Sequence, residues 1–68
     1  MKLNKLSDIP IGVDFTLYKE EWCVNRYMRV NIGHVNTVLL SCVQTLGDAR
    51  GSWCELSNFR PVYAKKHY

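Results

Sequence analysis

The most apolar run in the chain, Val35 to Val43, is rich in β-branched residues and contains neither Gly nor Pro. Its nine residues have the length of a buried strand and are few for an independent helix. Turn-forming residues bound the run on both sides, at 31–34 and 46–51. The pattern therefore predicts a central strand covered on both faces, whose expected core face carries Val38, Leu40 and Cys42.

A first strand is predicted over residues 13–18, after a loop in which Pro10 and Gly12 favour a turn. Apolar and polar residues alternate there with a period of two. Lys19–Glu21 is a polar connection short enough for a hairpin. The side chains expected to point inward from this strand are Val13, Phe15 and Leu17.

The second predicted strand runs from Trp22 to Val30, with Tyr27 and Arg29 on its solvent face. An antiparallel sheet with one wet face shows this alternation. Arg26 interrupts the apolar set and indicates either a bulge or a rim position with its head in water. A helix is the competing interpretation, which the β-branched and aromatic content disfavours. The expected core residues are Trp22, Val24, Met28 and Val30.

The rest of the chain predicts two more strands. Residues 52–56 form the fourth, with Cys54 and Leu56 inward and Trp53 and Glu55 outward. One turn of helix is expected at Ser57–Phe59, followed by a final edge strand, Arg60–Tyr63, where Pro61 is tolerated. We expect residues 1–7 to be an N-terminal arm, from which Leu3 and Leu6 can pack back, and residues 64–68 a frayed basic tail.

Five short strands at even spacing, with one helical turn before the last, predict an all-β fold in the form of a small antiparallel barrel. The stretch GSWCELSNFRPV, residues 51–62, resembles the end of a Src-homology-3-like barrel, where a Gly-aromatic strand leads through a helical turn into the last strand. The opening LSDIPIGVDF, residues 6–15, is similar to the start of many small barrel proteins of bacteriophages and mobile elements.

The two motifs cover about a third of the chain. The resemblance implies a fold and a phage origin. The acidic-aromatic first loop and the paired tryptophans of the members that bind proline-rich peptides are missing, so that activity is not implied.

Length and composition fit one small domain. The chain has 68 residues, of which 47% are hydrophobic and 22% charged, as in ordinary soluble globular proteins. No apolar run approaches the roughly 18–20 residues of a membrane span, and the N-terminus lacks the apolar core of a signal peptide. We therefore expect a cytoplasmic protein, in the host cytoplasm if a phage encodes it.

The three cysteines are widely spaced and form no CxxC pair, which favours free thiols over a disulfide framework. Zinc bound by Cys23, Cys42, Cys54 and His34 is arithmetically possible, but structural zinc sites usually bring ligands in closely spaced pairs. The preferred interpretation is that the cysteines are small buried hydrophobic residues and that the protein holds no metal or other cofactor.

No pattern in the chain is typical of an enzyme. His34 lies in a turn and His67 in the tail, where histidines are usually solvated. The acidic residues lack metal-binding or acid–base spacing, and no glycine loop for phosphate is present. A barrel this small also has little room for a deep catalytic pocket. We expect a protein that acts by binding.

Charge is unevenly distributed. Residues 1–21 carry three basic and four acidic residues, whereas 22–68 carry six basic and two acidic ones. Basic residues interleaved with aromatic ones suit single-stranded or structured nucleic acid, because phosphates attract cations and bases stack on rings. Lys65 and Lys66 extend the candidate surface. Its residues, which serve equally for a protein partner, are Arg26, Tyr27, Arg29, Arg50, Trp53, Arg60 and Tyr63.

A protein partner is the preferred interpretation. Trp, Tyr and Arg dominate interface hot spots, and the unpaired edges of a small open barrel invite strand addition or self-association. We expect a monomer or weak homodimer, a phage-type accessory protein that binds and modulates a host protein. Nucleic-acid binding is the alternative.

Overall fold

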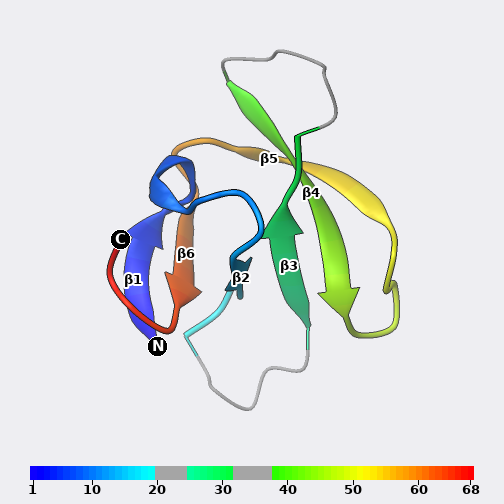
Figure 1. The fold of residues 1–68 in the computed structure, drawn as a ribbon, viewed down its shortest axis with the longest axis horizontal. Helices are drawn as coiled ribbons and strands as arrows, with labels where there is room; N and C mark the ends of the chain where they lie inside the picture. Colours follow the sequence, from blue (N-terminus) through cyan, green and yellow to red (C-terminus); the bar gives the residue numbers. More distant parts are fainter. Residues whose placement is uncertain (20–24, 32–37) are drawn as a thin grey trace.

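The computed structural model describes residues 1–19, 25–31 and 38–68. The described chain is all-β, apart from one single-turn 3-10 helix, and its strands pair antiparallel (Figure 1). In chain order the elements are β1 (Lys2–Lys5), η1 (Leu6–Asp8), β2 (Asp14–Phe15), β3 (Arg26–Arg29), β4 (Leu39–Leu46), β5 (Trp53–Ser57) and β6 (Pro61–Ala64).

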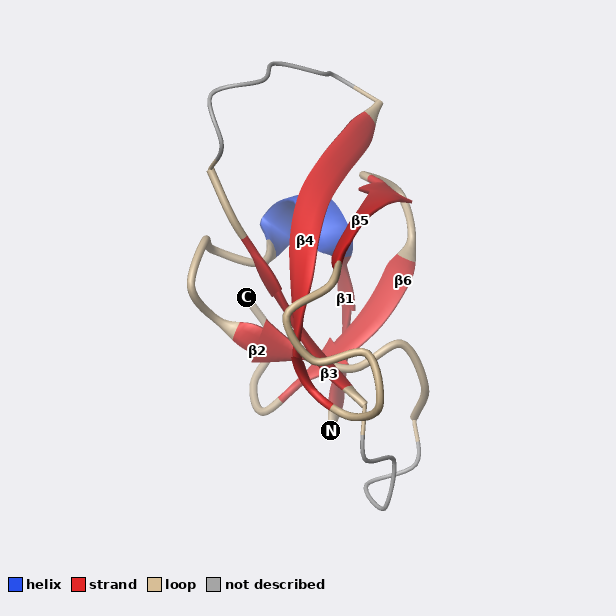
Figure 2. Cartoon of the chain, turned by 90° about the vertical axis from the view of Figure 1, so that its right-hand side faces the viewer, coloured by secondary structure: helices blue, strands red, loops and turns tan. Residues whose placement is uncertain are grey.

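The strands form two sheets, one with the order β1-β6 and one with the order β2-β3-β4-β5. Backbone bonds between Thr16 and Tyr63 join them, at 2.8 Å and 2.9 Å, so that β6 lies beside the end of β2. Seen from the side, the larger sheet lies in front of β1 and β6 (Figure 2). The all-β prediction is confirmed, but the described strands do not close into a barrel.

The core lies between the two sheets. Partly buried Val13 and Leu17 flank Phe15 and pack against this core, as the alternation predicts. Leu6 is buried as expected, whereas Leu3 is 55% exposed. In the described ranges, the fully buried apolar side chains are Leu6, Ile9, Phe15, Cys42, Val62 and Ala64.

The orientation of β3 corrects the sequence-based prediction. Tyr27 and Arg29 stand opposite Gln44 and Cys42, which are buried, so they lie on the inner face. Tyr27 packs against the core and stacks on Phe15, with ring centroids 6.0 Å apart. Directly opposite residues share a face of the sheet, so these contacts decide the orientation.

Met28, predicted to be a core residue, stands opposite Val43 on the outer face. The register shifts between Arg26 and Tyr27, where the pairing skips one residue of β4, so the predicted irregularity at Arg26 is present. Trp22 and Val24 lie outside the described residues.

The inward and outward sides of β4 and β5 were largely predicted. Cys42 is fully buried, and Leu40, Cys54 and Leu56 pack against the core. Val38 is the exception, because it precedes β4 and is 59% exposed. β4 begins at Leu39 and continues to Leu46, and residues 35–37 of the predicted strand lie outside the described residues.

The N-terminal arm expected at residues 1–7 is instead strand β1 followed by η1. β1 pairs with β6 over four residues. The basic tail is attached to it through the buried side chain of Asn4. The Asn4 amide donates to Lys66 O at 3.0 Å, and its oxygen accepts from Tyr68 N at 2.7 Å. The C-terminal residues therefore run back along β1 (Figure 1).

The predicted helical turn before the last strand is a β-turn. Arg60 N donates to Ser57 O at 3.0 Å, and Asn58 and Phe59 occupy the turn. The Ser57 hydroxyl accepts from Phe59 N at 3.2 Å, a local bond that competes with helix formation. Among the described residues, the one helical turn is η1. No helix in these ranges is long and apolar enough to cross a membrane.

The buried Asn4 amide supports a stability prediction. We expect Asn4→Ala to lower the free energy of unfolding by about 1–3 kcal/mol, because it removes the bonds to the tail and leaves buried backbone groups unpaired. Urea unfolding measures this change. Lys2→Ala, at an exposed position of the same strand, is the control and should change stability by less than about 0.5 kcal/mol. Equal effects of the two substitutions would contradict the role of Asn4.

Candidate functional site

Three strands carry an apolar row on the outer face of the larger sheet. Met28 of β3 stands opposite Val43 of β4, which stands opposite Trp53 of β5. Met28 and Val43 are half-buried, whereas Trp53 is 60% exposed at the end of the row. The row leads from the middle of the sheet to its edge strand.

β5 is an edge strand of the described sheet. Two backbone bonds show which opposite residues of β4 and β5 are hydrogen-bonded to each other. Gln44 N donates to Ser52 O at 3.0 Å, and Asn58 N donates to Val38 O at 2.9 Å. Since backbone groups alternate sides along a strand, Cys54 and Leu56 bond toward β4. The backbone N–H and C=O groups of Trp53 and Glu55 consequently point to the outer edge.

A shallow cavity of about 380 Å³ adjoins this edge, lined by Ser41, Trp53, Cys54 and Glu55. Ser41 and Glu55 form the cross-strand pair next to Val43 and Trp53. The edge thus combines free backbone groups, one large exposed ring and a hollow beside it. These features suit an added strand whose alternate side chains need somewhere to sit.

The structure places two of the seven predicted site residues, Tyr27 and Arg29, on the inner face of the sheet, where both are half-buried. Tyr27 stacks inside, as described above. Arg29 donates from Nη1 to Ile9 O at 2.6 Å and to Ser7 O at 3.4 Å. Its guanidinium therefore satisfies carbonyl groups around η1 and holds that turn against β3.

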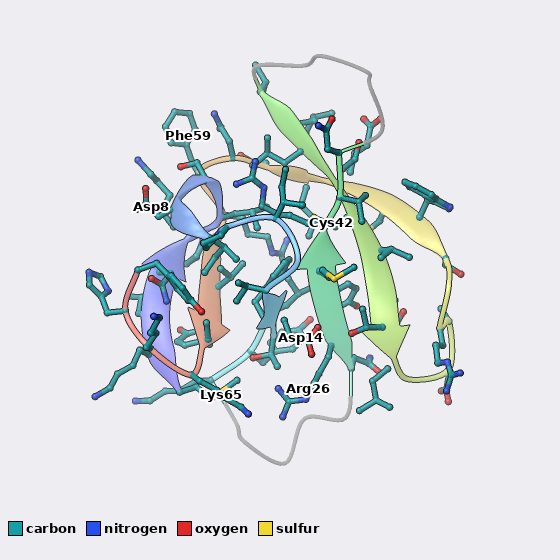
Figure 3. The ribbon with its side chains drawn as sticks, viewed as in Figure 1. Asp8, Asp14, Arg26, Cys42, Phe59 and Lys65 are labelled. Atoms are coloured by element: carbon teal, nitrogen blue, oxygen red, sulfur yellow. The ribbon has the colours of Figure 1, made fainter. Side chains whose placement is uncertain are left out.

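Arg26 lies at a second cavity of about 380 Å³, between β2, β3 and the tail. Its walls include Arg26 and Lys65, two cations, together with Asp14, Val13 and the ring of Tyr68. Figure 3 shows Asp14, Arg26 and Lys65 around the same region. Lys66 lies over the Tyr68 ring, with Nζ 5.0 Å from its centroid. Cationic and aromatic groups thus gather at this end.

The other predicted residues are dispersed. Arg50 is exposed in the turn between β4 and β5. Arg60 is half-buried after the Asn58–Phe59 turn, and its Nε is buried without a hydrogen-bond partner among the described residues. Tyr63 lies in β6 opposite Leu3. The predicted basic-aromatic surface is therefore not one continuous face.

Sequence reasoning missed several exposed apolar side chains. Phe59 is 70% exposed and contacts Lys5, whose Nζ lies 5.7 Å from its ring centroid. Ile11 and Tyr18 are 55% and 58% exposed. The outward positions of Met28 and Val43 were hidden because an apolar residue in an alternating strand is normally assigned to the core. A signal was available at Phe59, since it follows two turn-forming residues.

The inner face of the same strands holds two free thiols, Cys42 and Cys54, directly opposite each other. Burial raises the pKa of Cys42 to about 11, and the neighbouring Cys54 adds to this effect while Arg29 opposes it. Burial also raises the pKa of Cys54, and Arg60 opposes that shift. Both groups are protonated thiols at neutral pH.

The zinc alternative involves Cys23 and His34, which lie outside the described residues. Elsewhere in the chain, over the parts that the structure describes, no group of three or more His, Cys, Asp or Glu side chains is arranged to hold a metal ion. Among the described residues, Cys42 and Cys54 have no third ligand of this kind beside them.

Comparison of the chain with protein-family models, with curated protein sequences and with solved structures finds no match. The functional argument therefore depends on the residues and geometry described above.

We expect the Arg29 side chain to stabilise the folded protein. Arg29→Ala should lower the free energy of unfolding by about 1.5–3 kcal/mol, because hydrogen bonds from a charged donor to the carbonyl groups of Ser7 and Ile9 are lost. The exposed Arg50→Ala is matched in charge and should change stability by less than about 0.5 kcal/mol. Thermal and urea unfolding of both variants make the comparison. A neutral Arg29→Ala would show that the bonds around η1 contribute little.

The raised pKa of Cys42 predicts a loss of stability at high pH. Its pKa is about 11 in the folded protein and 9.0 when unfolded, so the folded state holds the proton more tightly. The stability that this tighter proton binding contributes is fully present below pH 9. The free energy of unfolding then falls by about 2–3 kcal/mol as the pH rises to about 11. Urea unfolding measured between pH 8 and about pH 11 should show that the free energy of unfolding falls less steeply with pH for Cys42→Ala than for the wild-type protein. Identical slopes would contradict the prediction.

Proposed function

We propose that this protein is a non-catalytic protein-binding module that captures an extended segment of its partner along β5. The observation that supports this proposal most is the exposed Trp53 at the unpaired edge of the described sheet. The partner segment adds as a strand to the N–H and C=O groups of Trp53 and Glu55. Main-chain bonds of this kind supply affinity, while side-chain contacts supply specificity.

The apolar row supplies the side-chain contacts. A strand beside β5 places every second side chain on the outer face, next to Trp53 and its neighbour Val43. Trp is among the residues that most often dominate interface energies. Glu55 follows on the same face and favours a basic residue in the partner at the adjacent position.

The Src-homology-3-like interpretation remains part of the proposal. Five consecutive strands, β2 to β6, return so that β6 lies beside the end of β2, which supports a barrel-like order. β1 is an additional strand outside that order. The resemblance of residues 6–15 and 51–62 to small phage barrels is the basis for proposing a phage-type accessory protein with a host protein as partner.

A second candidate function is nucleic-acid binding at the cavity between β2, β3 and the tail. Arg26, Lys65 and the Tyr68 ring meet there, which gives charge for phosphate and a face for stacking. It ranks second because Tyr27 and Arg29, two half-buried members of the predicted binding surface, already contact Phe15 and the Ile9 carbonyl group. Asp14 in the same cavity also opposes an anion.

Selection from a displayed library of random peptides tests the first proposal. We expect wild-type protein to enrich extended peptides with an apolar residue at alternate positions. Trp53→Ala and Glu55→Pro should each weaken binding of the selected peptides at least tenfold. Proline at position 55 removes an outward N–H and leaves the bonds to β4 intact, so the fold should survive. Amide NMR shifts should concentrate in β5.

Tyr18→Ala and Glu55→Ala are the controls, because Tyr18 is exposed to nearly the same extent as Trp53 and Glu55→Ala keeps the backbone N–H. Tyr18→Ala should retain binding within about threefold, whereas Glu55→Ala loses only the carboxylate that favours a basic residue and should weaken binding less than Glu55→Pro, since it keeps the main-chain bond. Peptides that bind Glu55→Pro as well as wild type would exclude strand addition. Concentration-dependent dimerisation that Glu55→Pro abolishes would instead identify a second copy as the occupant.

Oligonucleotide titration at low and near-physiological salt tests the second candidate. Binding at the Arg26 cavity should weaken steeply with salt, and Arg26→Ala with Lys65→Ala should flatten that dependence. Arg50→Ala is the charge-matched control. Absence of NMR shifts at low salt would eliminate nucleic-acid binding while leaving the peptide proposal intact.

A further inference from the structure

A row of polar and sulfur-bearing residues crosses the inner face of the larger sheet. Arg29 of β3 stands opposite Cys42 of β4, which stands opposite Cys54 of β5. Cys42 is labelled on β4 in Figure 3. Arg60, after the turn that follows β5, acts electrostatically on Cys54. Two guanidinium groups therefore flank a pair of free thiols.

The backbone places these thiols within bridging range. Cys42 and Cys54 form a pair in the hydrogen-bonded phase of β4 and β5, as the bonds at Gln44 and Asn58 show. The Cα atoms of such a pair are about 5.5 Å apart, within the range of roughly 4.4–6.8 Å that disulfides span. Their side chains share the inner face and both pack against the core.

We propose that Cys42 and Cys54 are a reversible oxidation site, at which a small disulfide such as oxidised glutathione converts the two thiols into one cross-strand disulfide. Cys54 is half-buried and Cys42 fully buried, so Cys54 reacts first. Burial raises the pKa of Cys54 and Arg60 only partly opposes that shift, so the minor thiolate fraction carries the reaction.

The reaction proceeds by two exchanges. The Cys54 thiolate attacks one sulfur of oxidised glutathione, and a mixed disulfide forms as the first glutathione thiolate leaves. The Cys42 thiolate then attacks Cys54 Sγ and releases the second glutathione. The two cysteines lose two protons and two electrons, and the oxidant becomes two molecules of reduced glutathione. Arg29 faces Cys42 during the second step.

The geometry makes this bond easy to reverse. In a hydrogen-bonded pair the Cβ atoms stand toward the upper end of the roughly 4.5–5.5 Å typical of strand pairs, while a relaxed disulfide requires about 3.5–4.5 Å. Closing the bond therefore strains the strands. Strained disulfides are reduced more readily than structural ones. We therefore expect a switchable modification.

The test uses full-length protein with Cys23→Ser, so that the third thiol takes no part. The folded protein is incubated with oxidised glutathione at pH 8, about the pKa of an ordinary thiol, and its intact mass is followed without reductant. We expect a product two hydrogens lighter, and proteolysis should recover residues 42 and 54 in one linked peptide. Reduced glutathione should restore both thiols.

Single variants report the order of events. In the Cys23→Ser background, Cys42→Ser should accumulate the mixed disulfide, because the resolving thiol is missing. Cys54→Ser should react at least tenfold more slowly than Cys42→Ser, because the remaining thiol is buried. Amide NMR spectra of each variant establish that it is folded. Equal rates for the two variants would overturn the assigned order.

The disulfide proposal fails if the folded protein keeps two thiols, or stops at the mixed disulfide, while the urea-unfolded chain oxidises under the same conditions. A pair placed at the neighbouring outer-face position, Ser41→Cys with Glu55→Cys in a chain lacking the native cysteines, tests the strain argument. That pair should require a higher ratio of reduced to oxidised glutathione for half-reduction. A lower ratio would contradict the strain.

Discussion

The joint between Thr16 and Tyr63 is the constraint on which the arrangement depends. Its two backbone bonds connect the sheets, and the Thr16 side chain, 1% exposed, donates its hydroxyl proton to Tyr18 O at 2.8 Å. With β6 held against the end of β2, Val62 and Phe15 meet in the core. Without the joint, neither two-stranded β1-β6 nor the larger sheet would cover the other's apolar face, and isolated two-stranded sheets are marginally stable.

The same enclosure explains why polar side chains point inward. Among the described residues six apolar side chains are fully buried, and in so small a core some backbone carbonyl groups are paired by side chains. Arg29 reaches the carbonyl groups near η1, Asn4 those of the tail, and Gln44 that of Leu46. Each of these side chains places a hydrogen-bond donor beside a backbone carbonyl oxygen in or near a turn. Such partners offset the cost of burying a polar group.

How well each strand could be predicted depends on whether apolar or polar side chains point inward from it. β4 and β5 could be assigned from alternation because Leu40, Cys42, Cys54 and Leu56 obey it. β3 could not, because its orientation is decided by acceptors on η1 and by the Phe15 ring, which local sequence does not reveal. β1 was invisible for the same reason, since its partner β6 is distant in the chain. The exposed Trp53 was predictable, but the edge position on which the proposed function depends required the strand order.

β5 consequently presents different chemistry in three directions. Its outer face carries Trp53, its inner face Cys54, and its free edge the backbone groups of Trp53 and Glu55. A disulfide to β4 would tie the inner face and leave the free edge uncovered, whereas an added strand would cover the edge and leave the thiols in place. The strain of closing the disulfide would nevertheless move β5 toward β4 and alter the spacing presented to a partner. The proposed oxidation and the proposed peptide capture are therefore separable in chemistry but coupled through the position of one strand.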